Sequence, residues 1–84
     1  MHDLHAADLI LKLVLEKAKE NKLKKVTKIV LELGSVIEHG AEINPENLKF
    51  NLALLSSNTI AVNAEIEIKN AKTNTWKLLE IEGE

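Results

Sequence analysis

The 84-residue sequence contains no cysteine. This excludes a disulfide framework, a thiolate zinc site, an iron–sulfur cluster and a thiol nucleophile, and nothing points to an oxidising compartment. A chain this short buries only about 60% of the surface that its unfolded form exposes. Stability must therefore come from the packing of a small apolar core, and we expect a cytoplasmic protein.

Arginine is also absent, and the only aromatic residues are Phe50 and Trp76. Bidentate arginine contacts dominate the recognition of phosphate and guanine, and aromatic rings stack on single-stranded bases. The 11 lysines face 13 acidic residues, which gives a formal net charge of −2. We therefore expect no nucleic-acid partner, and we interpret the lysines at 22, 24, 25 and 28 as a solvated helix end and turn.

Long apolar runs are missing as well. The most apolar segment, Leu9–Leu15, is interrupted by Lys12 and is far shorter than the roughly 20 residues that a membrane-spanning helix needs. Asp3 and Asp8 precede it, where a signal peptide would carry positive charge. We expect no membrane partner.

Patterns that mark an enzyme do not occur either. The few serines lie in loop-like places, and the sequence holds no glycine-rich nucleophile turn, phosphate-binding loop or dinucleotide fingerprint. The many Asp and Glu residues single out no pair for acid–base catalysis. The sequence therefore predicts no enzymatic activity.

The first periodic segment predicts an amphipathic helix over about residues 4–21. Its apolar positions recur at steps of three and four: Leu4, Ala7, Leu11, Val14 and Ala18. Asp3 can cap its start, and lysines follow its negative C-terminal end. Leu9 and Leu13 lie off this stripe, and they form either a partner surface or a surface that the loop at 35–43 covers.

A period of two over residues 25–33 predicts a strand that ends near Gly34. The segment Ser35–Ile43 has no clear period and is predicted to be a loop. Asn44 is a preferred helix N-cap and Pro45 fits the first helical position, so a second helix is expected to begin here. Its buried row is expected to contain Leu48, Leu52 and Leu55, extended by Phe50 and Leu54.

The polar residues at 56–58 are expected to stop this helix. Clean alternation over 63–69 predicts a strand with one solvated face, and the polar residues 70–74 predict a turn. A last strand is expected over about 75–82. The adjacent pair Leu78–Leu79 breaks its alternation, which indicates a bulge or a strand buried on both sides.

The elements therefore run helix, strand, helix, strand, strand, which predicts an α+β fold. The strand-helix-strand part suits a crossover between parallel strands, and the last two strands suit an antiparallel hairpin. The expected architecture is a three-stranded mixed sheet with both helices packed on its apolar face. Neither an internal repeat nor a linker occurs, so residues 1–84 are predicted to form a single domain.

The N-terminus holds the most suggestive cluster for chemistry. The α-amine of Met1 and the amide nitrogen and imidazole of His2 can form fused chelate rings around one metal ion, and Asp3 can add an amide or carboxylate donor. Nitrogen-rich planar coordination suits Ni(II) or Cu(II), with Cu(II) the tighter of the two. His5, one helical turn on, can reach the same ion or support its ligands.

The alternative is a frayed terminal histidine without function. His39 is predicted to be a solvated loop residue. Phe50 and Trp76 are interpreted as packing in the core or at its rim rather than as a ligand platform.

Several segments, taken together, resemble a known family in their order and spacing. They are Met1–Leu4, Lys25–Gly34, Asn44–Phe50, Thr59–Ala61, Ala64–Ile68 and Leu78–Glu82. This pattern is similar to the HypA/HybF family, accessory proteins that help to insert nickel during maturation of NiFe hydrogenases.

The resemblance implies a nickel-binding domain with two helices on a three-stranded sheet. It implies a transient Ni(II) site at an N-terminal Met-His-Glu motif, which falls on Met1, His2 and Asp3, so the carboxylate is kept but shortened. Family members insert a zinc domain with two Cys-x-x-Cys pairs between the last two strands. Here Asn70–Thr75 simply joins those strands, so the zinc insertion is expected to be absent and no structural zinc is expected.

The function that follows is a nickel-binding accessory protein, or metallochaperone, for hydrogenase maturation. Its implied partners are hydrogenase maturation proteins or the hydrogenase large subunit, and its oligomeric state stays open. The alternative is a metal-independent adaptor that kept the fold, lost the nickel task, and docks through Leu9 and Leu13.

Overall fold

The computed structural model describes residues 2–35, 37–38 and 41–84, and it describes side chains for residues 6–35 and 42–84. Its elements are α1 (His2–Glu20), β1 (Val26–Leu33), β2 (Ile37–Glu38), β3 (Ala41–Glu42), α2 (Pro45–Leu55), the short 3₁₀ helix η1 (Ser56–Asn58), β4 (Glu65–Asn70) and β5 (Trp76–Gly83).

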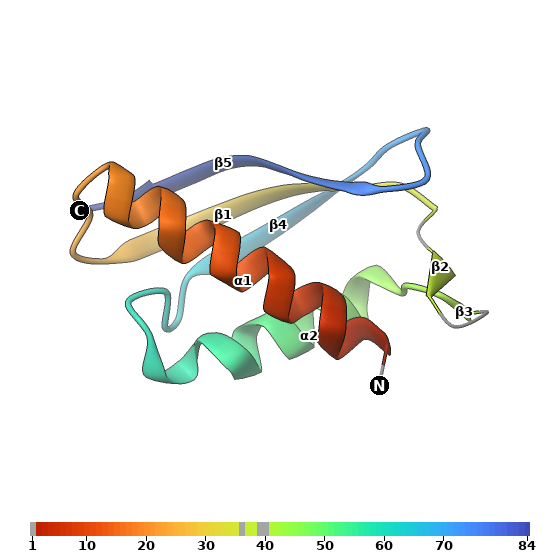
Figure 1. The fold of residues 1–84 in the computed structure, drawn as a ribbon, viewed down its shortest axis with the longest axis horizontal. Coiled ribbons are helices and arrows are strands. Elements are labelled where there is room, and N and C mark those ends of the chain that lie inside the picture. The colour runs from red at the N-terminus through yellow and green to blue at the C-terminus, as the bar shows by residue number, and fades with distance from the viewer. Residues whose placement is uncertain (1, 36, 39–40) are drawn as a thin grey trace.

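The three long strands form one mixed sheet in the order β4-β1-β5. β1 pairs with β4 in parallel and with β5 in antiparallel orientation. Both helices lie on the same face of this sheet, as Figure 1 shows. The predicted α+β fold, with two helices on a three-stranded mixed sheet, is therefore confirmed.

The predicted hairpin between the last two strands is wrong, because β1 lies between them. β1 is the strand with the most buried apolar side chains: Val26, Ile29, Val30, Leu31 and Leu33. Ile29, Leu31 and Leu33 share one face, and Val30 is buried on the other face between Lys28 and Glu32. A strand with this many buried side chains is best shielded in the middle of a sheet.

The connection from β4 to β5 therefore crosses the end of β1. The N–H of Gly34 donates to the carbonyl of Thr75 at 2.9 Å, and the N–H of Ser35 donates to that of Thr73 at 2.8 Å. A Cβ at position 34 would lie 2.1 Å from the Thr73 carbonyl oxygen. Glycine is needed at this position because the crossing chain lies directly against it.

The core forms between the sheet and one side of each helix. From α1 it receives five side chains: Ala7, Ile10, Leu11, Val14 and Ala18. From α2 it receives Leu48 and Leu52, with Leu55 partly buried beside them. The expected buried row of α2 is wrong at Phe50 and Leu54, which are 67% and 58% exposed, because at 100° per residue these positions turn away from Leu48 and Leu52.

The start of α2 follows the prediction closely. The side-chain oxygen of Asn44 accepts hydrogen bonds from the N–H groups of Glu46, at 2.8 Å, and Asn47, at 3.2 Å. Pro45 occupies the first turn, where a missing N–H costs no helical bond. The expected stop at residues 56–58 is a single 3₁₀ turn.

The segment predicted as a loop contains a small two-stranded ladder. β2 and β3 pair in antiparallel orientation, Ile37 with Glu42 and Glu38 with Ala41. Strands of two residues are too short to show a period in the sequence. Val36, His39 and Gly40 lie outside the described residues, so the prediction for His39 is not tested.

The irregularity predicted at Leu78–Leu79 is a β-bulge. Val30 pairs with Glu80 and the next residue of β1, Leu31, pairs with Leu78, which leaves Leu79 without a partner on β1. The extra residue is 41% exposed and interrupts the regular spacing of β5.

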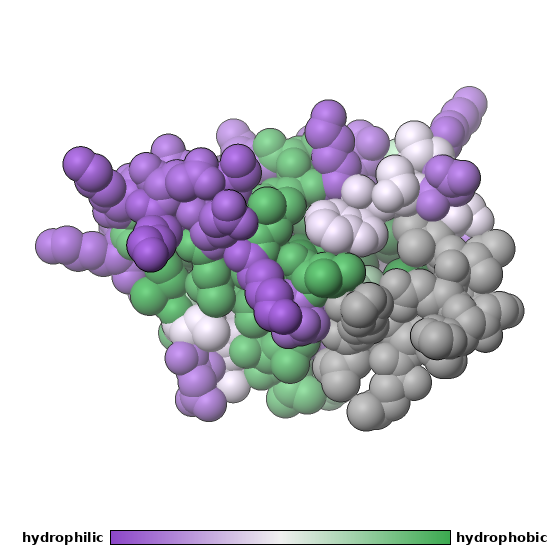
Figure 2. Space-filling model, in the orientation of Figure 1, coloured by the Kyte–Doolittle hydropathy of each residue, from purple (hydrophilic) through white to green (hydrophobic). Residues whose placement is uncertain are grey.

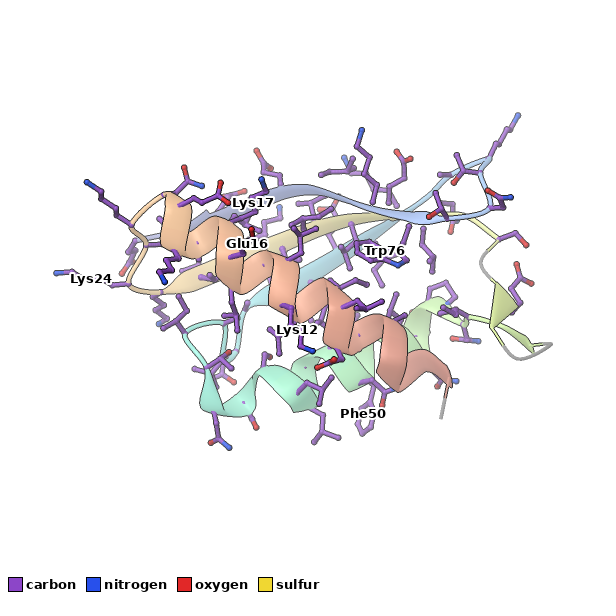
Figure 3. The ribbon with its side chains drawn as sticks, in the orientation of Figure 1. Lys12, Glu16, Lys17, Lys24, Phe50 and Trp76 are labelled. Atoms are coloured by element: carbon purple, nitrogen blue, oxygen red, sulfur yellow. The ribbon has the colours of Figure 1, made fainter. Side chains whose placement is uncertain are left out.

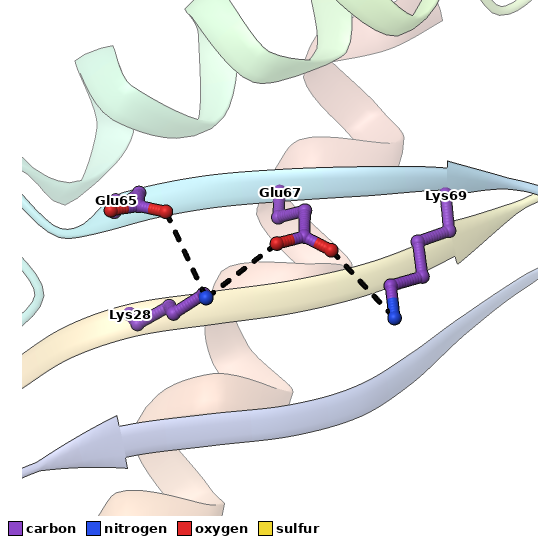
Figure 4. A network of polar contacts seen from close by, with 4 residues as sticks. All are labelled: Lys28, Glu65, Glu67 and Lys69. Carbon is purple, nitrogen blue, oxygen red and sulfur yellow. Dashed lines mark ion pairs between the residues drawn. The ribbon is translucent and has the colours of Figure 1, made fainter.

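The face of the sheet away from the helices carries a small charge network (Figure 4). The Lys28 ammonium lies 3.5 Å from a Glu67 oxygen and 3.8 Å from a Glu65 oxygen, and Lys69 lies 3.7 Å from Glu67. The charge of Glu67, and after it that of Glu65, raises the pKa of Lys28 above its usual value. The charged forms of these residues therefore attract each other across β1 and β4 on the solvated side.

The C-terminus of α1 is closed by a residue in the left-handed region. Lys22 has a φ of 56°. Its N–H donates to the carbonyl of Lys19 at 3.1 Å, and the N–H of Leu23 donates to that of Ala18 at 2.9 Å. This is a Schellman motif, in which the left-handed position normally favours glycine.

We expect Lys22→Gly to stabilise the fold by about 0.5–1 kcal/mol, since relief of left-handed strain exceeds the added entropy of the unfolded chain. Urea denaturation would measure the change. Lys24→Gly is the matched control: Lys24 is an exposed lysine of the same turn without a positive φ, so this substitution should destabilise. Equal effects of the two substitutions would contradict the assignment of strain to Lys22.

We expect Glu67→Gln to lower the pKa of Lys28 toward 10.5, because the largest cause of the shift is removed. NMR titration of the Lys28 side chain would measure this, with Glu80→Gln as a control that leaves the pKa unchanged. Because folding raises this pKa, the stabilisation is present below pH 10.5 and is lost as the pH rises through the folded-state value. An unchanged Lys28 pKa in Glu67→Gln would rule out this pairing.

Candidate metal centre

The predicted metal ligands lie at the start of α1. The helix begins at His2, so the backbone of His2, Asp3 and His5 lies in its first turn, while Met1 lies outside the described residues. The side chains of these ligands also lie outside the described part. The structure therefore brings the backbone of three of the four predicted residues into one helical turn.

This position leaves backbone nitrogens available. The first N–H groups of a helix have no carbonyl partner within the helix. The amide nitrogens of His2 and Asp3 belong to this set, because α1 begins at His2. A metal ion that binds these nitrogens would break no hydrogen bond of the helical ladder.

The helix is fixed directly after this turn. Ala6, Ala7 and Ile10 are completely buried. On the exposed side, Asp8 and Lys12 form an i,i+4 ion pair at 3.0 Å. The terminal turn is therefore a short extension of a firmly packed helix.

A cavity that the sequence did not predict lies where the parallel strands β1 and β4 end. Its volume is about 420 Å³. Its polar lining comes from Ser35, Glu42, Asn44 and Asn70. The predicted crossover of parallel strands was the signal that could have found it, because crevices form at the carboxyl ends of such strands. With one carboxylate, and with Asn44 engaged in capping α2, its lining does not form a metal site.

The predicted ligand set comes from the terminal turn. Among the side chains that the structure describes, no three His, Asp or Glu residues come together in an arrangement that could hold a metal ion. None of the described helices is long and apolar enough to cross a membrane.

The remaining predicted residues divide between core and surface (Figure 3). Trp76 is partly buried against the core, as expected, whereas Phe50 points into solvent. Leu9 is 41% exposed and Leu13 is half-buried. Figure 2 shows apolar surface across the middle of the face that α1 and α2 form.

The sequence matches the family model described as hydrogenase/urease nickel incorporation, metallochaperone, HypA, over residues 1–76. Three hydrogenase maturation factors HypA are similar. That of Methanobrevibacter smithii is 39% identical over 69 residues, 82% of this chain and 52% of that protein. That of Legionella pneumophila is 35% identical over 68 residues, 81% of this chain and 57% of that protein. That of Archaeoglobus fulgidus is 37% identical over 79 residues, 94% of this chain and 68% of that protein.

The chain thus spans between about half and two thirds of the length of these relatives. Among solved structures, the solution structure of the Ni metallochaperone HypA from Helicobacter pylori has the same fold. The TM-score is 0.78 at 14% identity, with 99% of this chain and 97% of that chain covered. Since the family model covers residues 1–76 and the relatives are 35–39% identical, this chain belongs to the HypA family of hydrogenase and urease nickel-incorporation proteins.

Proposed function

We propose that the chain is a nickel metallochaperone that binds Ni(II) at Met1, His2 and Asp3 and passes it to a protein target in hydrogenase maturation. The observation that carries this proposal is family membership combined with a histidine at the first position of α1. Nickel is the cargo, and the chain catalyses no reaction. The site of action is the cytoplasm, and the partners are maturation proteins or the hydrogenase large subunit.

The donor set explains why nickel would bind here. The Met1 amine, the His2 amide nitrogen and the His2 imidazole supply three nitrogens within two consecutive residues, and Asp3 supplies a further amide or a carboxylate. Such nitrogen-rich sets favour planar Ni(II) and bind Cu(II) more tightly, so selectivity for nickel comes from the supply of metal in the cell. His5 lies three residues along the same helix, close enough to support the ion or its ligands.

The same arrangement favours release. The proposed donors lie in the terminal turn of α1, and the completely buried Ala6 and Ala7 follow this turn. In this proposal a target protein exchanges ligands with the bound ion one at a time, while Ala6 and Ala7 stay packed in the core. A transient carrier needs this property, whereas a structural metal site encloses its ion.

In this proposal residues 1–84 act as one nickel-binding domain without the zinc insertion. β4 ends at Asn70 and β5 begins at Trp76, and the intervening residues lie against the end of β1 through Gly34 and Ser35. No zinc ligand is required to hold the two strands, since each pairs with β1 along its length.

A second candidate function is a metal-independent adaptor. The observation that favours it is the exposure of Leu9 on α1, 41%, next to half-buried Leu13 on the predicted partner surface. An adaptor would bind a maturation partner equally well with and without nickel, and its binding would be insensitive to His2.

We expect His2→Ala to abolish stoichiometric nickel binding in calorimetry of the untagged protein, because it removes the imidazole, the donor that closes the second chelate ring, and leaves only the amine and the backbone amide nitrogen. One glycine added before Met1 should have the same effect, since it displaces the amine. His39→Ala is the matched control and should keep full binding. Full binding by His2→Ala would remove the site assignment, and partner binding independent of His2 and nickel would favour the adaptor.

We expect nickel affinity to weaken by more than about a hundredfold between pH 8 and pH 6, because protons compete for an α-amine and an imidazole, whose ordinary pKa values are about 8 and 6.5, and because the amide nitrogen must release its proton to bind the ion. Absorption of the planar complex, followed during titrations at several pH values, would measure the change. An affinity that is constant over this range would show that carboxylates, rather than these nitrogens, hold the ion.

A further inference from the structure

The outer edge of β4 is unpaired within the part of the chain that the structure describes. β4 is the first strand of the order β4-β1-β5, and its one neighbour is β1. Figure 4 shows the strand with the Lys28 network on one side and no strand beyond it. An edge of this kind offers a row of backbone donors and acceptors to another strand.

The direction of these backbone groups follows from the hydrogen bond that ends the ladder. The N–H of Ala71 donates to the carbonyl of Leu33 at 3.0 Å, so this residue turns its backbone toward β1. Backbone direction alternates along a strand. The N–H and C=O groups of Ile66, Ile68 and Asn70 therefore point outward, away from β1.

The opposite edge of the sheet is less suited to pairing. β5 carries the bulge at Leu79, which breaks the regular spacing of its backbone groups. α1 also packs along β5, as Figure 1 shows. β4 has no register shift along its pairing with β1.

We propose that the β4 edge binds the β4 edge of a second copy of this chain, in antiparallel orientation and centred on Ile68. The sheets of the two copies then join into one continuous sheet around a two-fold axis. In this register Ile68 lies opposite Ile68 of the second copy, and Ile66 lies opposite its Asn70. All three are outward-facing residues, so each pair exchanges backbone hydrogen bonds.

Charge complementarity makes a second copy the fitting partner. In the same register Glu67 of each copy lies opposite Lys69 of the other, on the solvated face and in the closely spaced type of pair. Both side chains are available, with exposed fractions of 41% and 59%, and they already attract each other within one strand at 3.7 Å. A shift by two residues would place Glu67 opposite Glu67, which like-charge repulsion disfavours.

The helix side of the edge has room for the apolar side chain of the partner. A groove of about 460 Å³ runs between β4 and the start of α2 and is lined by Pro45, Glu46 and Lys49 from α2 and by Glu65, Ile66, Glu67 and Ile68 from β4. Opposed residues in an antiparallel pair point to the same face. Ile68 of the second copy would therefore lie over this groove beside Ile68 of the first.

The test is a concentration series of the whole chain in analytical ultracentrifugation, where we expect a reversible dimer. Glu67→Lys and Lys69→Glu should each weaken self-association roughly tenfold, since each places like charges opposite each other twice. Mixing the two variants should restore association as a heterodimer, because their charges complement each other. Glu80→Lys and Lys77→Glu change the same charges on exposed positions of β5 and should leave the dimer unchanged.

Asn70→Pro separates pairing from folding. It removes an outward N–H without removing a donor to β1, so the thermal unfolding transition should persist while the dimer is lost. A wild-type chain that stays monomeric at all concentrations, or charge variants that associate as the wild type does, would overturn the proposal. Failure of the mixed variants to associate while both remain folded would also overturn it.

Discussion

The rest of this structure depends on the burial of β1 on both faces. Its five buried aliphatic side chains can be shielded only if strands lie on both sides and a layer of helices covers one face. This requirement places β4 and β5 at the edges and α1 and α2 together beneath them. The solvated face needs less cover, because Lys28, Glu65 and Glu67 lie over the junction of β1 and β4.

The position of the candidate metal centre follows from the same core. α1 is held by fully buried residues from Ala6 to Ala18, and helical backbone extends ahead of them to His2. The chemistry proposed for this chain therefore lies in the first turn of a helix that the core holds from Ala6 onward.

Much of the fold was accessible from the sequence because its signals are local. The period of α1, the strand pattern of β1 and the cap at Asn44 each act over a few residues, and the helix, the strand and the cap are confirmed. The alternation of β1 is broken by Val30, which is buried between Ile29 and Leu31. The strand order was not accessible, since it depends on which neighbours cover β1, a property of the whole sheet. The exposure of Phe50 and Leu54 was not accessible either, since apolar side chains on a helix usually face the core and these two do not. The terminal ligand set stays a prediction, which rests on donor chemistry and family resemblance rather than on any packing signal.

Leu33 has a role in the architecture beyond filling the core. Its backbone is the register partner of Asn70, the last residue of β4, and of Trp76, the first residue of β5. One residue of the central strand thus fixes both points between which the connecting chain must run, about two strand spacings or roughly 10 Å apart. The sheet therefore sets the distance that the connection must cover, but it does not set the number of residues in the connection. A junction of this kind can accept or lose a whole module during evolution while every strand keeps its register.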